Sequence, residues 1–401
     1  MIVLEYLFWL ALATVAYTYV GYAVLVGLLA RLVGRLRAPQ PLAAYTPDVT
    51  LVVPAYNEAT ILAAKLDNCL AQDYPAGRLQ LVVITDGSTD DSTQVLARYP
   101  GVRHLHVPAR GGKSLAENRA MQFVTTPYVV FTDANTELNP GAVRELVQHY
   151  QNPRVGAVSG EKKVRALAGS TPGAGEGLYW KYESFLKRCD SRVCSLMGAA
   201  GELVSFRTEL FGPLEADTIL DDFVQSLRIV EQGYTVVYEP GAYATEDPSA
   251  SLADEWERKI RICAGGWQAM GRLRGLLNPL RQPLVSLLYV SHRVLRWSLA
   301  PVALALLLPL SVVLATTASG WLAGVYGAAL GAQALFYLAA WQGWRGATSK
   351  LAVVPLYFTM MNLAVFAGFR RYYRKAQPAA WAKAARPAAP AASASFAAVA
   401  E

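Results

Sequence analysis

Long apolar segments at both ends of the chain enclose a more polar middle, and this pattern limits the possible folds more than any other feature. The segment Ile2–Ala30 carries a single charge, at Glu5, over a length that can span a bilayer. Three further apolar segments follow in the last third of the chain, at about Val294–Ala315, Trp321–Ala340 and Leu351–Phe369. The pattern predicts an integral membrane protein whose water-soluble domain lies between its membrane segments.

The composition agrees with a membrane location. Hydrophobic residues make up 53% of the chain and charged residues only 17%, which is too apolar for an ordinary soluble protein. The net charge is +7, and basic residues flank the apolar segments, as is typical of the cytoplasmic side of a plasma or inner membrane with its anionic lipids. No basic stripe is interleaved with aromatic residues, so no nucleic-acid partner is predicted. The four cysteines lack zinc spacing and are expected to be free thiols.

The basic clusters conflict with a simple count of membrane spans. One N-terminal span with Arg31–Arg37 inside places the soluble domain in the cytoplasm. Three further spans would then put Arg370–Lys375 outside, against the positive-inside rule. Either one C-terminal segment is re-entrant or interfacial, or the rule fails here, and we favour the first alternative.

The chain therefore divides into four predicted parts. Residues 1–38 form an N-terminal transmembrane helix, and residues 45–272 form the cytoplasmic domain. Residues 273–375 hold an interfacial helix, expected within Leu273–His292, and about three membrane segments. The Ala- and Pro-rich residues 376–401 are expected to be disordered.

The cytoplasmic domain alternates apolar, strand-like runs with charged helical patterns such as Glu58–Leu70 and Ser92–Arg98. The strand-like runs are Val49–Val53, Leu79–Ile84, Tyr128–Phe131, Val155–Ser159 and Thr235–Tyr238. This alternation predicts an α/β fold with a mainly parallel, doubly wound sheet and right-handed crossovers.

A carboxylate and an amide follow the third of these runs directly. Asp133 and Asn135 are two residues apart, so on an extended segment their oxygens point the same way. Open α/β sheets bind ligands at the carboxyl ends of their strands. Two hard oxygen ligands at this spacing suit a divalent cation that also holds a diphosphate.

Other strand ends carry polar turns that suit a nucleotide. The Val53–Glu58 turn combines Pro54 with polar residues, although Asn57 could instead cap the next helix. Asp86 ends the next strand, where it is placed to accept from a base N–H or a ribose hydroxyl, and the residues after it can cap the following helix. Further on, Arg110–Lys113 offers two glycines and a lysine to a phosphate, without the spacing of a Walker A loop.

The order of these motifs, from residue 49 to about residue 268, resembles that of the family-2 inverting glycosyltransferases, which have a GT-A fold. The resemblance implies a nucleotide-diphospho-sugar donor that is UDP-linked, Mg²⁺ or Mn²⁺ as the cofactor, and a glycan or lipid-linked acceptor. The residues that it places around the nucleotide are Pro54, Tyr56, Glu58, Asp86 and Lys113.

The same resemblance assigns the metal ligands and the catalytic base. Asp133 and Asn135 stand where the family carries an Asp-any-Asp metal motif. Because Asn135 replaces the second Asp and its amide oxygen carries less charge than a carboxylate, Asp133 is the firmer ligand. Ile219–Phe223 matches the acidic element of the family, in which the second acid, here Asp222, is the general base, and Asp221 raises its proton affinity by like-charge repulsion. Such a base removes the acceptor hydroxyl proton during a single in-line displacement. Without the resemblance, the pair would be interpreted as a cap of the following helix.

A basic segment, Glu257–Arg261, stands where processive members of the family carry Gln-any-any-Arg-Trp. Arg258 and Arg261 share a helix face, so both could grip a diphosphate. Ile262 replaces the Trp that stacks on the acceptor sugar, which weakens the case for processivity, and Trp267 is the nearest substitute. The alternative for this segment is a basic amphipathic helix on lipid headgroups.

Two further segments bear on the acceptor. The small-residue loop Met197–Glu202 is similar to one that lies near the acceptor sugar in membrane-bound synthases, with a plain turn as the alternative. The aromatic residues Tyr179, Trp180, Tyr182 and Phe185 are expected to pack as an amphipathic helix, with stacking on a sugar as the less favoured alternative.

Three functions remain open from the sequence. The first is a membrane-bound transferase that moves a sugar to a polysaccharide or a glycolipid, as the cellulose, hyaluronan and poly-N-acetylglucosamine synthases do. The second is a polyprenyl-phosphate sugar transferase, with a lipid phosphate as its acceptor. The third is a non-catalytic membrane protein that binds a sugar nucleotide.

Overall fold

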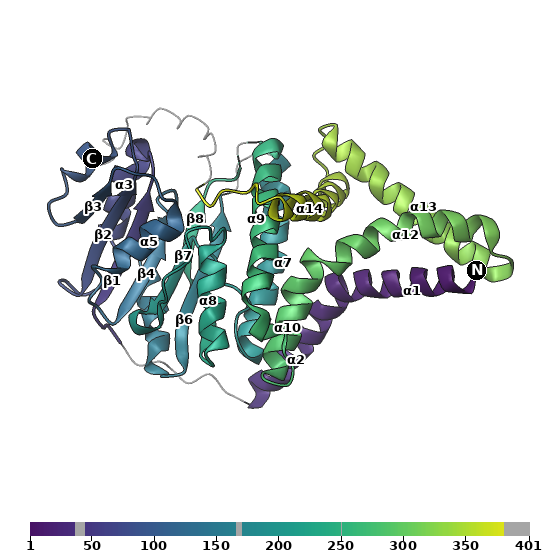
Figure 1. Ribbon diagram of the computed structural model, residues 1–401, viewed down its shortest axis with the longest axis horizontal. Coiled ribbons are helices and arrows are strands. Elements are labelled where there is room, and N and C mark those ends of the chain that lie inside the picture. Colours follow the sequence, from purple (N-terminus) through teal and green to yellow (C-terminus); the bar gives the residue numbers. More distant parts are fainter. Residues whose placement is uncertain (37–44, 166–170, 250, 381–401) are drawn as a thin grey trace, which may run out of the picture.

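An α/β domain and a group of apolar helices lie at opposite ends of the molecule (Figure 1). The computed structural model describes residues 1–36, 45–165, 171–249 and 251–380. Most of the tail that the sequence predicts to be disordered, residues 381–401, lies outside the described residues, as do residues 37–44 of the linker after the N-terminal helix.

Eight strands form one mixed sheet in the order β3-β2-β1-β4-β7-β6-β8-β5. The strands are β1 (Val49–Ala55), β2 (Leu79–Asp86), β3 (Arg103–Val107), β4 (Tyr128–Thr132), β5 (Glu137–Leu138), β6 (Val155–Val164), β7 (Leu203–Arg207) and β8 (Thr235–Glu246). The pairs β1–β2, β1–β4, β2–β3 and β6–β8 are parallel, whereas β7 runs antiparallel to both β4 and β6. The strand order reverses at β1, which is where open α/β sheets bind ligands.

All five strand-like runs of the sequence lie in strands, which confirms the predicted α/β fold. The strands β3 and β5, which the sequence did not reveal, lie at the two edges of the sheet. An edge strand has fewer apolar neighbours, and β3 accordingly alternates Arg and His with apolar residues. Its pattern is therefore too polar to stand out in the sequence.

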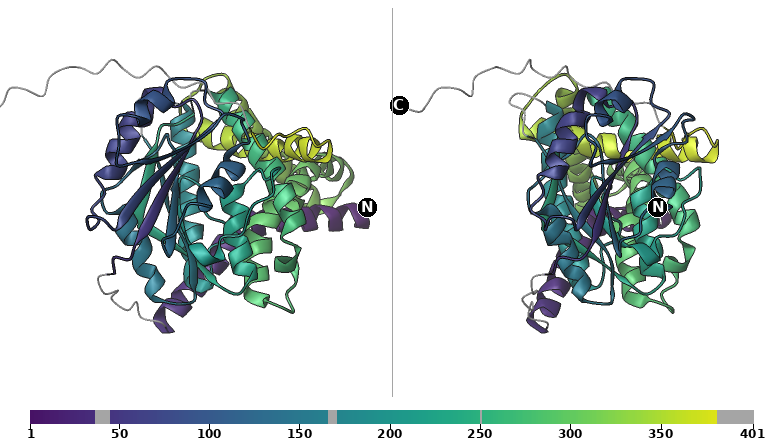
Figure 2. Two further views of the ribbon diagram at one scale, coloured as in Figure 1. Left: turned by 60° about the vertical axis from the view of Figure 1, so that its left-hand side comes forward. Right: turned by 90° about the vertical axis from the view of Figure 1, so that its left-hand side faces the viewer.

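Helices cover both faces of the sheet (Figure 2). They are α3 (Ala59–Leu70), α4 (Ser92–Leu96), α5 (Lys113–Met121), α6 (Ala142–Val147), α7 (Thr171–Val193), α8 (Asp221–Glu231) and α9 (Leu252–Arg272). Along β1, Val52 faces the core that contains residues of α5, α7 and α8, whereas Leu51 and Val53 face the core shared with α3, α4 and α6. Burial on both faces explains why the strands are continuous apolar runs in the sequence.

The C-terminal part is helical, and its three long helices contain most of the predicted apolar segments. The helices are α10 (Pro283–Tyr289), η5 (Val290–Val294), α11 (Leu295–Trp297), α12 (Leu299–Thr317), α13 (Gly320–Trp344) and α14 (Lys350–Tyr373). By length and composition, four helices within the described residues can cross a membrane: Ile2–Val33, α12, α13 and α14.

The region predicted to hold an interfacial helix, Leu273–His292, contains only short helical stretches. Leu276, Leu288 and Tyr289 from this region are buried in the core that also contains residues of α7 and α8. These three residues therefore pack inside the protein, whereas Leu280 of the same region is 94% exposed.

The N-terminal apolar segment is one long helix that bends in its middle. It consists of α1 (Ile2–Ala16), a π-helical turn η1 (Tyr17–Gly21) and α2 (Tyr22–Leu36). α1 packs against α12, whereas α2 packs against α7 and buries Tyr22 and Val26 in the core of the α/β domain. A π-helical turn is a common site of bending. Its presence lets the second half of the helix support the α/β domain.

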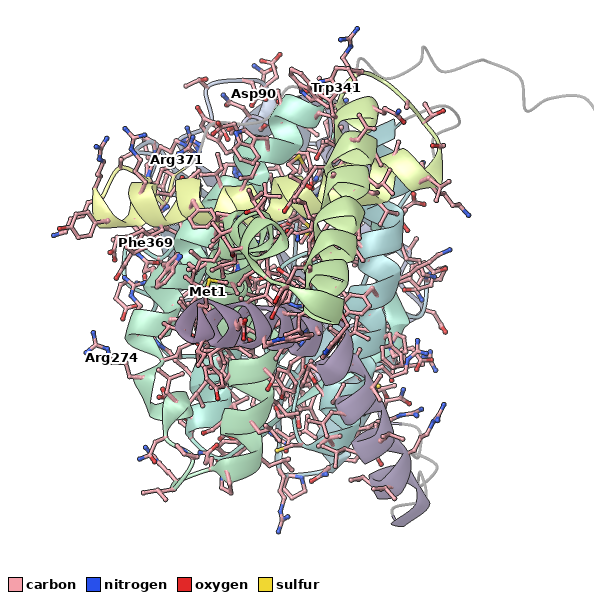
Figure 3. All side chains as sticks on the ribbon, turned by 90° about the vertical axis from the view of Figure 1, so that its right-hand side faces the viewer. Met1, Asp90, Arg274, Trp341, Phe369 and Arg371 are labelled. Atoms are coloured by element: carbon pink, nitrogen blue, oxygen red, sulfur yellow. The ribbon has the colours of Figure 1, made fainter. Side chains whose placement is uncertain are left out.

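The last helix, α14, takes a different direction from the other apolar helices. In Figure 3 it runs across the view with Phe369 and Arg371 on it, while α1 points toward the viewer with Met1 at its end. α14 packs on α9 and α13. At Gly368 it approaches α9 so closely that an added Cβ would lie 2.5 Å from Cys263 Cβ and 2.8 Å from the backbone nitrogen of Ala264.

Gly368→Ala is therefore expected to destabilise the protein, because the backbone of α9 cannot move away from a methyl group without separating the two helices. Overpacking of this kind costs about 1–3 kcal/mol. Thermal unfolding of the detergent-solubilised protein should show a lower Tm. Gly324→Ala is the matched control, since nothing lies within 4 Å of an added Cβ there, and it should keep or raise the Tm. Equal Tm values for the two variants would contradict the close packing of α14 on α9.

Candidate functional site

The carboxyl ends of β1, β2 and β4 open into one large cleft at the point where the strand order reverses. Residues of α5, α8 and α9 complete its walls. All of the site residues predicted from the sequence line this cleft: Pro54, Tyr56, Glu58, Asp86, Lys113, Asp133, Asn135, Asp221, Asp222, Arg258 and Arg261. The fold thus brings together motifs that lie far apart in the chain.

Lys113, the first residue of α5, joins the carboxylates in the cleft. Its ammonium lies 2.8 Å from Asp133 Oδ1, 3.3 Å from Asp221 Oδ2 and 3.9 Å from Glu117 Oε1. Burial alone would lower the pKa of Lys113, but Asp133 and Asp221 outweigh it and raise this pKa well above its ordinary value. A lysine that stays charged therefore holds the end of β4 against the start of α8.

Glu117, one turn along α5, is the carboxyl group of this cluster with a raised proton affinity. Burial, followed by the charge of Asp221 and a hydrogen bond to it, raises the pKa of Glu117 well above its usual range, while Lys113 opposes the shift.

Asp222, in the first turn of α8, has the pKa of a general base near neutral pH. Burial and then the charge of Asp221 raise the pKa of Asp222 to about 7, while Lys113 opposes the shift. A carboxylate with this pKa can accept a proton from a hydroxyl at neutral pH. Gly201 lies against it, since an added Cβ there would be 3.2 Å from Asp222 Oδ2. The small-residue loop that contains Gly201 therefore leaves the base open to the cleft.

The acid pair, Asp221 and Asp222, does not cap α8. The N-cap residue is Leu220, whose side chain makes no capping hydrogen bond. Both acids lie in the first turn of the helix, where the helix dipole favours negative charge. The alternative that they serve as a cap is wrong, and their carboxyl groups face the cleft.

Asp86 holds the glycine loop that precedes α5. Its carboxylate accepts hydrogen bonds from the backbone N–H groups of Gly111 at 3.0 Å and Gly112 at 2.6 Å, and it also pairs with Arg119 of α5. A base or ribose at the predicted position would therefore meet a carboxylate that already fixes this loop. Sequence reasoning missed Arg119 because it belongs to no motif, and only the packing of α5 beside β2 brings it to Asp86.

The turns after β1 and β2 hold each other in place. The side chain of Asn57 accepts a hydrogen bond from the N–H of Thr89 at 2.8 Å, so it does not cap α3 as one interpretation of the sequence proposed. Asp90 accepts from the N–H of Ala59 at 2.9 Å and from that of Ser92 at 3.1 Å. One carboxylate thus serves the first turns of both α3 and α4, which confirms the predicted capping role of the second turn.

A cation–π pair forms one wall of the cleft. The guanidinium of Arg110 lies 3.7 Å from the ring centre of Tyr56, and both residues line the cleft beside Pro54 and Glu58. The stacked pair offers a flat surface of the size of a nucleobase, with delocalised positive charge behind it.

Asp133 and Asn135 offer two oxygen ligands to a divalent cation. Both line the cleft, and Asn135 is exposed. In the part of the chain that the structure describes, no group of three or more His, Cys, Asp or Glu side chains is placed to hold a metal ion. A cation here would need further oxygens from a diphosphate and water, which is how Mg²⁺ is commonly held. The donor set therefore fits a metal that binds together with a nucleotide.

The two arginines of α9 face different partners. Arg258 forms ion pairs with Glu255 at 2.8 Å and with Glu246 at 3.6 Å. Burial lowers the pKa of Arg261, while the nearby charge of Asp221 opposes this shift. Arg261 therefore lies near the acid pair, whereas Arg258 is engaged by carboxylates at the edge of the cleft.

The helix α9 does not lie on the surface as a basic amphipathic helix would. Glu255 is 0% exposed and Lys259 5% exposed, and α14 packs over the helix. Trp267 packs on Phe369 of α14, with their ring centres 4.8 Å apart, and it is not among the residues that line the cleft. The structure thus gives Trp267 a packing role, whereas Arg258 and Arg261 line the cleft.

The cleft continues beyond the acid pair toward the apolar helices. Lys187, Arg293 and Arg296 line this part, together with Tyr179 and Trp180. Sequence reasoning missed the three cations, although charged residues beside an apolar segment are a signal of function because their burial is costly. Tyr182 of α7 lines the cleft as well, whereas Phe185 is not among its lining residues.

Comparisons with known proteins agree with the geometry of the cleft. Residues 50–201 match the family described as Glycosyl transferase family 2, and residues 128–367 match Glycosyl transferase family group 2. The chain is 22% identical over 231 residues to the poly-beta-1,6-N-acetyl-D-glucosamine synthase of Staphylococcus epidermidis, and 24% identical over 235 residues to that of Staphylococcus aureus strain COL. Each alignment covers 56% of this chain and 56% of the relative, so the chain spans about half the length of the curated relatives it matches.

Among solved structures, the mannosyltransferase PcManGT from Pyrobaculum calidifontis, in complex with GDP-Man and Mn²⁺, is similar to this chain with a TM-score of 0.69. The similarity covers 92% of this chain and 99% of that chain, at 24% sequence identity. The two proteins therefore share a fold that includes the apolar helices as well as the α/β domain.

Asp86→Asn is expected to loosen the glycine loop, because an amide nitrogen cannot accept from Gly111, Gly112 or Arg119. Breaking a buried charge pair costs about 3–5 kcal/mol. The Tm should fall, and trypsin should cut after Arg110 at lower enzyme concentration than in the unchanged protein.

Asp73→Asn is the control for this change, because its pair with Arg144 has the same type of contact, at 2.8 Å, but with an Asp73 side chain that is 67% exposed. An exposed pair contributes little to stability. If the two variants lose stability to the same extent, Asp86 does not hold the loop.

Proposed function

Because the chain belongs to Glycosyl transferase family group 2, we propose that it moves a sugar from a UDP-linked donor to a glycan or lipid-linked acceptor at the cytoplasmic face of a membrane. The observation that carries this proposal is the acid pair at the start of α8, held by Lys113 against the carboxylate at the end of β4. A base, cations for a leaving diphosphate and oxygen ligands for a metal lie in one cleft. These are the groups that an inverting transfer requires.

Asp222 acts as the general base. Its carboxylate, with a pKa of about 7, removes the proton from an acceptor hydroxyl as that oxygen attacks the anomeric carbon of the donor. A single in-line displacement inverts the configuration at that carbon. Asp221 keeps the proton affinity of Asp222 high, and Gly201 leaves the space through which the hydroxyl approaches.

Lys113 and Arg261 stabilise the departing diphosphate. Lys113 lies at the N-terminus of α5, directly after two glycines whose backbone can approach a phosphate. Arg261 supplies a second cation near the acid pair. A Mg²⁺ or Mn²⁺ ion held by Asp133 and Asn135 would stabilise the charge that develops on the leaving oxygen. Tyr56 and Arg110 bind the base of the nucleotide.

The same proposal places α1, α12 and α13 across the bilayer and α14 along its cytoplasmic surface. α14 lies across the other apolar helices and packs on α9 (Figure 3). With three spans, Arg370–Lys375 return to the side of Arg31 and the catalytic domain, as the positive-inside rule requires. This arrangement removes the conflict between the basic clusters of the sequence.

A second candidate is the processive synthesis of a polysaccharide. The similarity to poly-beta-1,6-N-acetyl-D-glucosamine synthases favours it. The Ile262 that follows Arg261 favours a limited number of additions, because no Trp in this position can stack on a growing chain. A screen of UDP- and GDP-sugars scored by nucleotide release, followed by sizing of the product, distinguishes the two candidates.

The pH dependence tests the base. Since Asp222 must be unprotonated, kcat/KM should rise with pH through about 7 and then level off. Asp222→Asn should lower kcat about 10²–10⁴-fold without loss of fold. Asp221→Asn removes the like charge, so the pKa of Asp222 falls and the acidic limb of the profile should move to lower pH.

Asp217→Asn is the matched control, because Asp217 is an acid with a 75% exposed side chain that pairs with Arg272 outside the acid pair. It should keep the profile of the unchanged enzyme. If Asp222→Asn keeps the same rate and the same rise of kcat/KM with pH, Asp222 is not the general base.

Calorimetry of UDP binding tests the metal ligands. Binding should require Mn²⁺ or Mg²⁺ and should be lost with EDTA, because the cation would link the negatively charged diphosphate to Asp133 and Asn135. Asn135→Ala should weaken the metal-dependent binding, whereas Asn135→Asp should preserve or strengthen it, since a carboxylate adds charge at the same place. If the affinity for UDP is unchanged both by EDTA and by Asn135→Ala, no metal ion binds at this position.

A further inference from the structure

The part of the cleft nearest the apolar helices contains more positive than negative charge. We call this part the basic pocket: Lys187 of α7, Arg293 of η5 and Arg296 of α11. Glu183 is the carboxylate that both arginines contact, 2.8 Å from Arg293 Nη1 and 3.2 Å from Arg296 Nη1. Glu183 also lies 3.3 Å from His292, so a single carboxylate is shared by two arginines and a histidine.

The other carboxylates near the basic pocket are already engaged. Asp190 accepts from Tyr22 and is bonded to His292. Glu202 pairs with Lys162 at 2.7 Å, and Glu161 accepts from Ser184 at 2.6 Å. None of these described contacts supplies a carboxylate to Lys187.

Two cations of the basic pocket have unsatisfied hydrogen-bonding groups. Arg296 Nε and Nη2 are buried and have no hydrogen-bond partner in the described part of the chain. Lys187 is 3% exposed, and its amine makes no hydrogen bond or ion pair with any described residue, its nearest ring centres being those of Trp180 at 5.2 Å and Tyr238 at 6.0 Å. A buried cation without an anion is strongly unfavourable. A ligand with negative charge would satisfy both groups.

The basic pocket is separate from the acid pair but connected to it along the cleft. Trp180 lies within cation–π distance of both Lys187, at 5.2 Å, and Lys162, at 5.1 Å. Lys162 pairs with Glu202, the neighbour of Gly201, which itself lies against Asp222. Arg293 of the basic pocket lies 5.7 Å from the ring centre of Phe223, the residue after Asp222, so an anion in the basic pocket would lie in the same cleft as the reacting hydroxyl.

The cleft that contains the basic pocket also has an apolar surface on α14, which Tyr19 and Tyr182 connect to Arg296. Val354, Phe358, Met361 and Val365 of this helix line the same cleft. A ligand that reaches from the acid pair through the basic pocket thus ends among apolar side chains on a helix that packs with the membrane helices. The lining of the cleft thus combines the polar acid pair, the cationic basic pocket and an apolar surface on α14.

We propose that the acceptor is a sugar joined through phosphate to a lipid chain, with the phosphate in the basic pocket and the lipid chain along α14. This inference rests on the proposed function and names the acceptor of the same site. The acceptor oxygen forms a bond to the anomeric carbon of the donor, and the bond from that carbon to the diphosphate oxygen breaks with its electron pair leaving on UDP. The hydroxyl proton passes to Asp222. The acceptor phosphate takes no part in the bond changes.

A lipid phosphate that attacks the donor itself fits the structure less well. A phosphate oxygen is already deprotonated at neutral pH and needs no base, so Asp222 would have no role in such a transfer.

Calorimetry with farnesyl phosphate tests the basic pocket without turnover. The full-length protein in detergent should bind farnesyl phosphate and should bind farnesol at least about tenfold more weakly, because each charged hydrogen bond is worth about that factor or more. Lys187→Met and Arg296→Gln should each weaken the binding of farnesyl phosphate about tenfold or more. Lys187→Met should also keep or raise the Tm, because it removes a buried unpaired ammonium.

Lys181→Met is the matched control, since Lys181 is an exposed lysine of the same helix outside the cleft. It should bind farnesyl phosphate as the unchanged protein does. Equal binding of farnesol and farnesyl phosphate, or unchanged binding in both Lys187→Met and Arg296→Gln, would overturn the proposal. Inorganic phosphate that binds as tightly as farnesyl phosphate would overturn its lipid part.

Two further measurements separate this inference from the proposed function. UDP binding in the presence of Mn²⁺ should be the same in Lys187→Met and in the unchanged protein, and a protein that binds UDP but no farnesyl phosphate contradicts this inference alone. In transfer assays, Lys187→Met should raise the KM for farnesyl-diphospho-N-acetylglucosamine with little change in kcat, and leave the KM for the neutral octyl N-acetylglucosaminide unchanged. Equal changes for the two acceptors would assign Lys187 a structural role.

Discussion

The site depends on one ammonium group placed between carboxylates that would otherwise repel one another. Lys113 contacts both Asp133 and Asp221, which come from the end of β4 and the start of α8. Its position is set by the glycine loop before α5, where Gly112 takes a φ of 91° and Asp86 accepts from the backbone of the loop. Because several carboxylates in a buried cleft are unfavourable without a cation, the arrangement of the whole site follows from the way this loop positions the start of α5.

The apolar helices pack directly on the helices that form the cleft. α2 packs along α7, and α14 packs on α9 at Gly368. The catalytic domain and the membrane part therefore share a core instead of being joined by a linker, as the burial of Tyr22 together with residues of α7 and α8 shows. The walls of the cleft continue onto α14, so the acid pair and an apolar helix surface belong to one cleft, as the proposed acceptor requires.

Predictions of strands and helix caps from the sequence were correct where the structure depends only on residues that are adjacent in the chain. The apolar runs became strands, and Asp90 serves as a helix cap, because each depends on a few adjacent residues. The caps expected of Asn57 and of the acid pair were wrong. In each case a partner from another element, Thr89 for Asn57 and Lys113 for the acids, competes for the same side chain. A capping motif identifies residues that can accept a hydrogen bond, but it does not identify the donor.

The sequence by itself determined the α/β fold, the apolar helices and the motifs at the strand ends, because hydrophobic periodicity and turn residues act over short stretches of chain. Only the tertiary structure decided which charges meet. It joined Asp86 to Arg119, gathered Lys187 and Arg296 into one pocket, and turned α14 across the other apolar helices. These contacts connect elements that are distant in the sequence, and they arise from the packing of complete helices and strands, which no local pattern encodes.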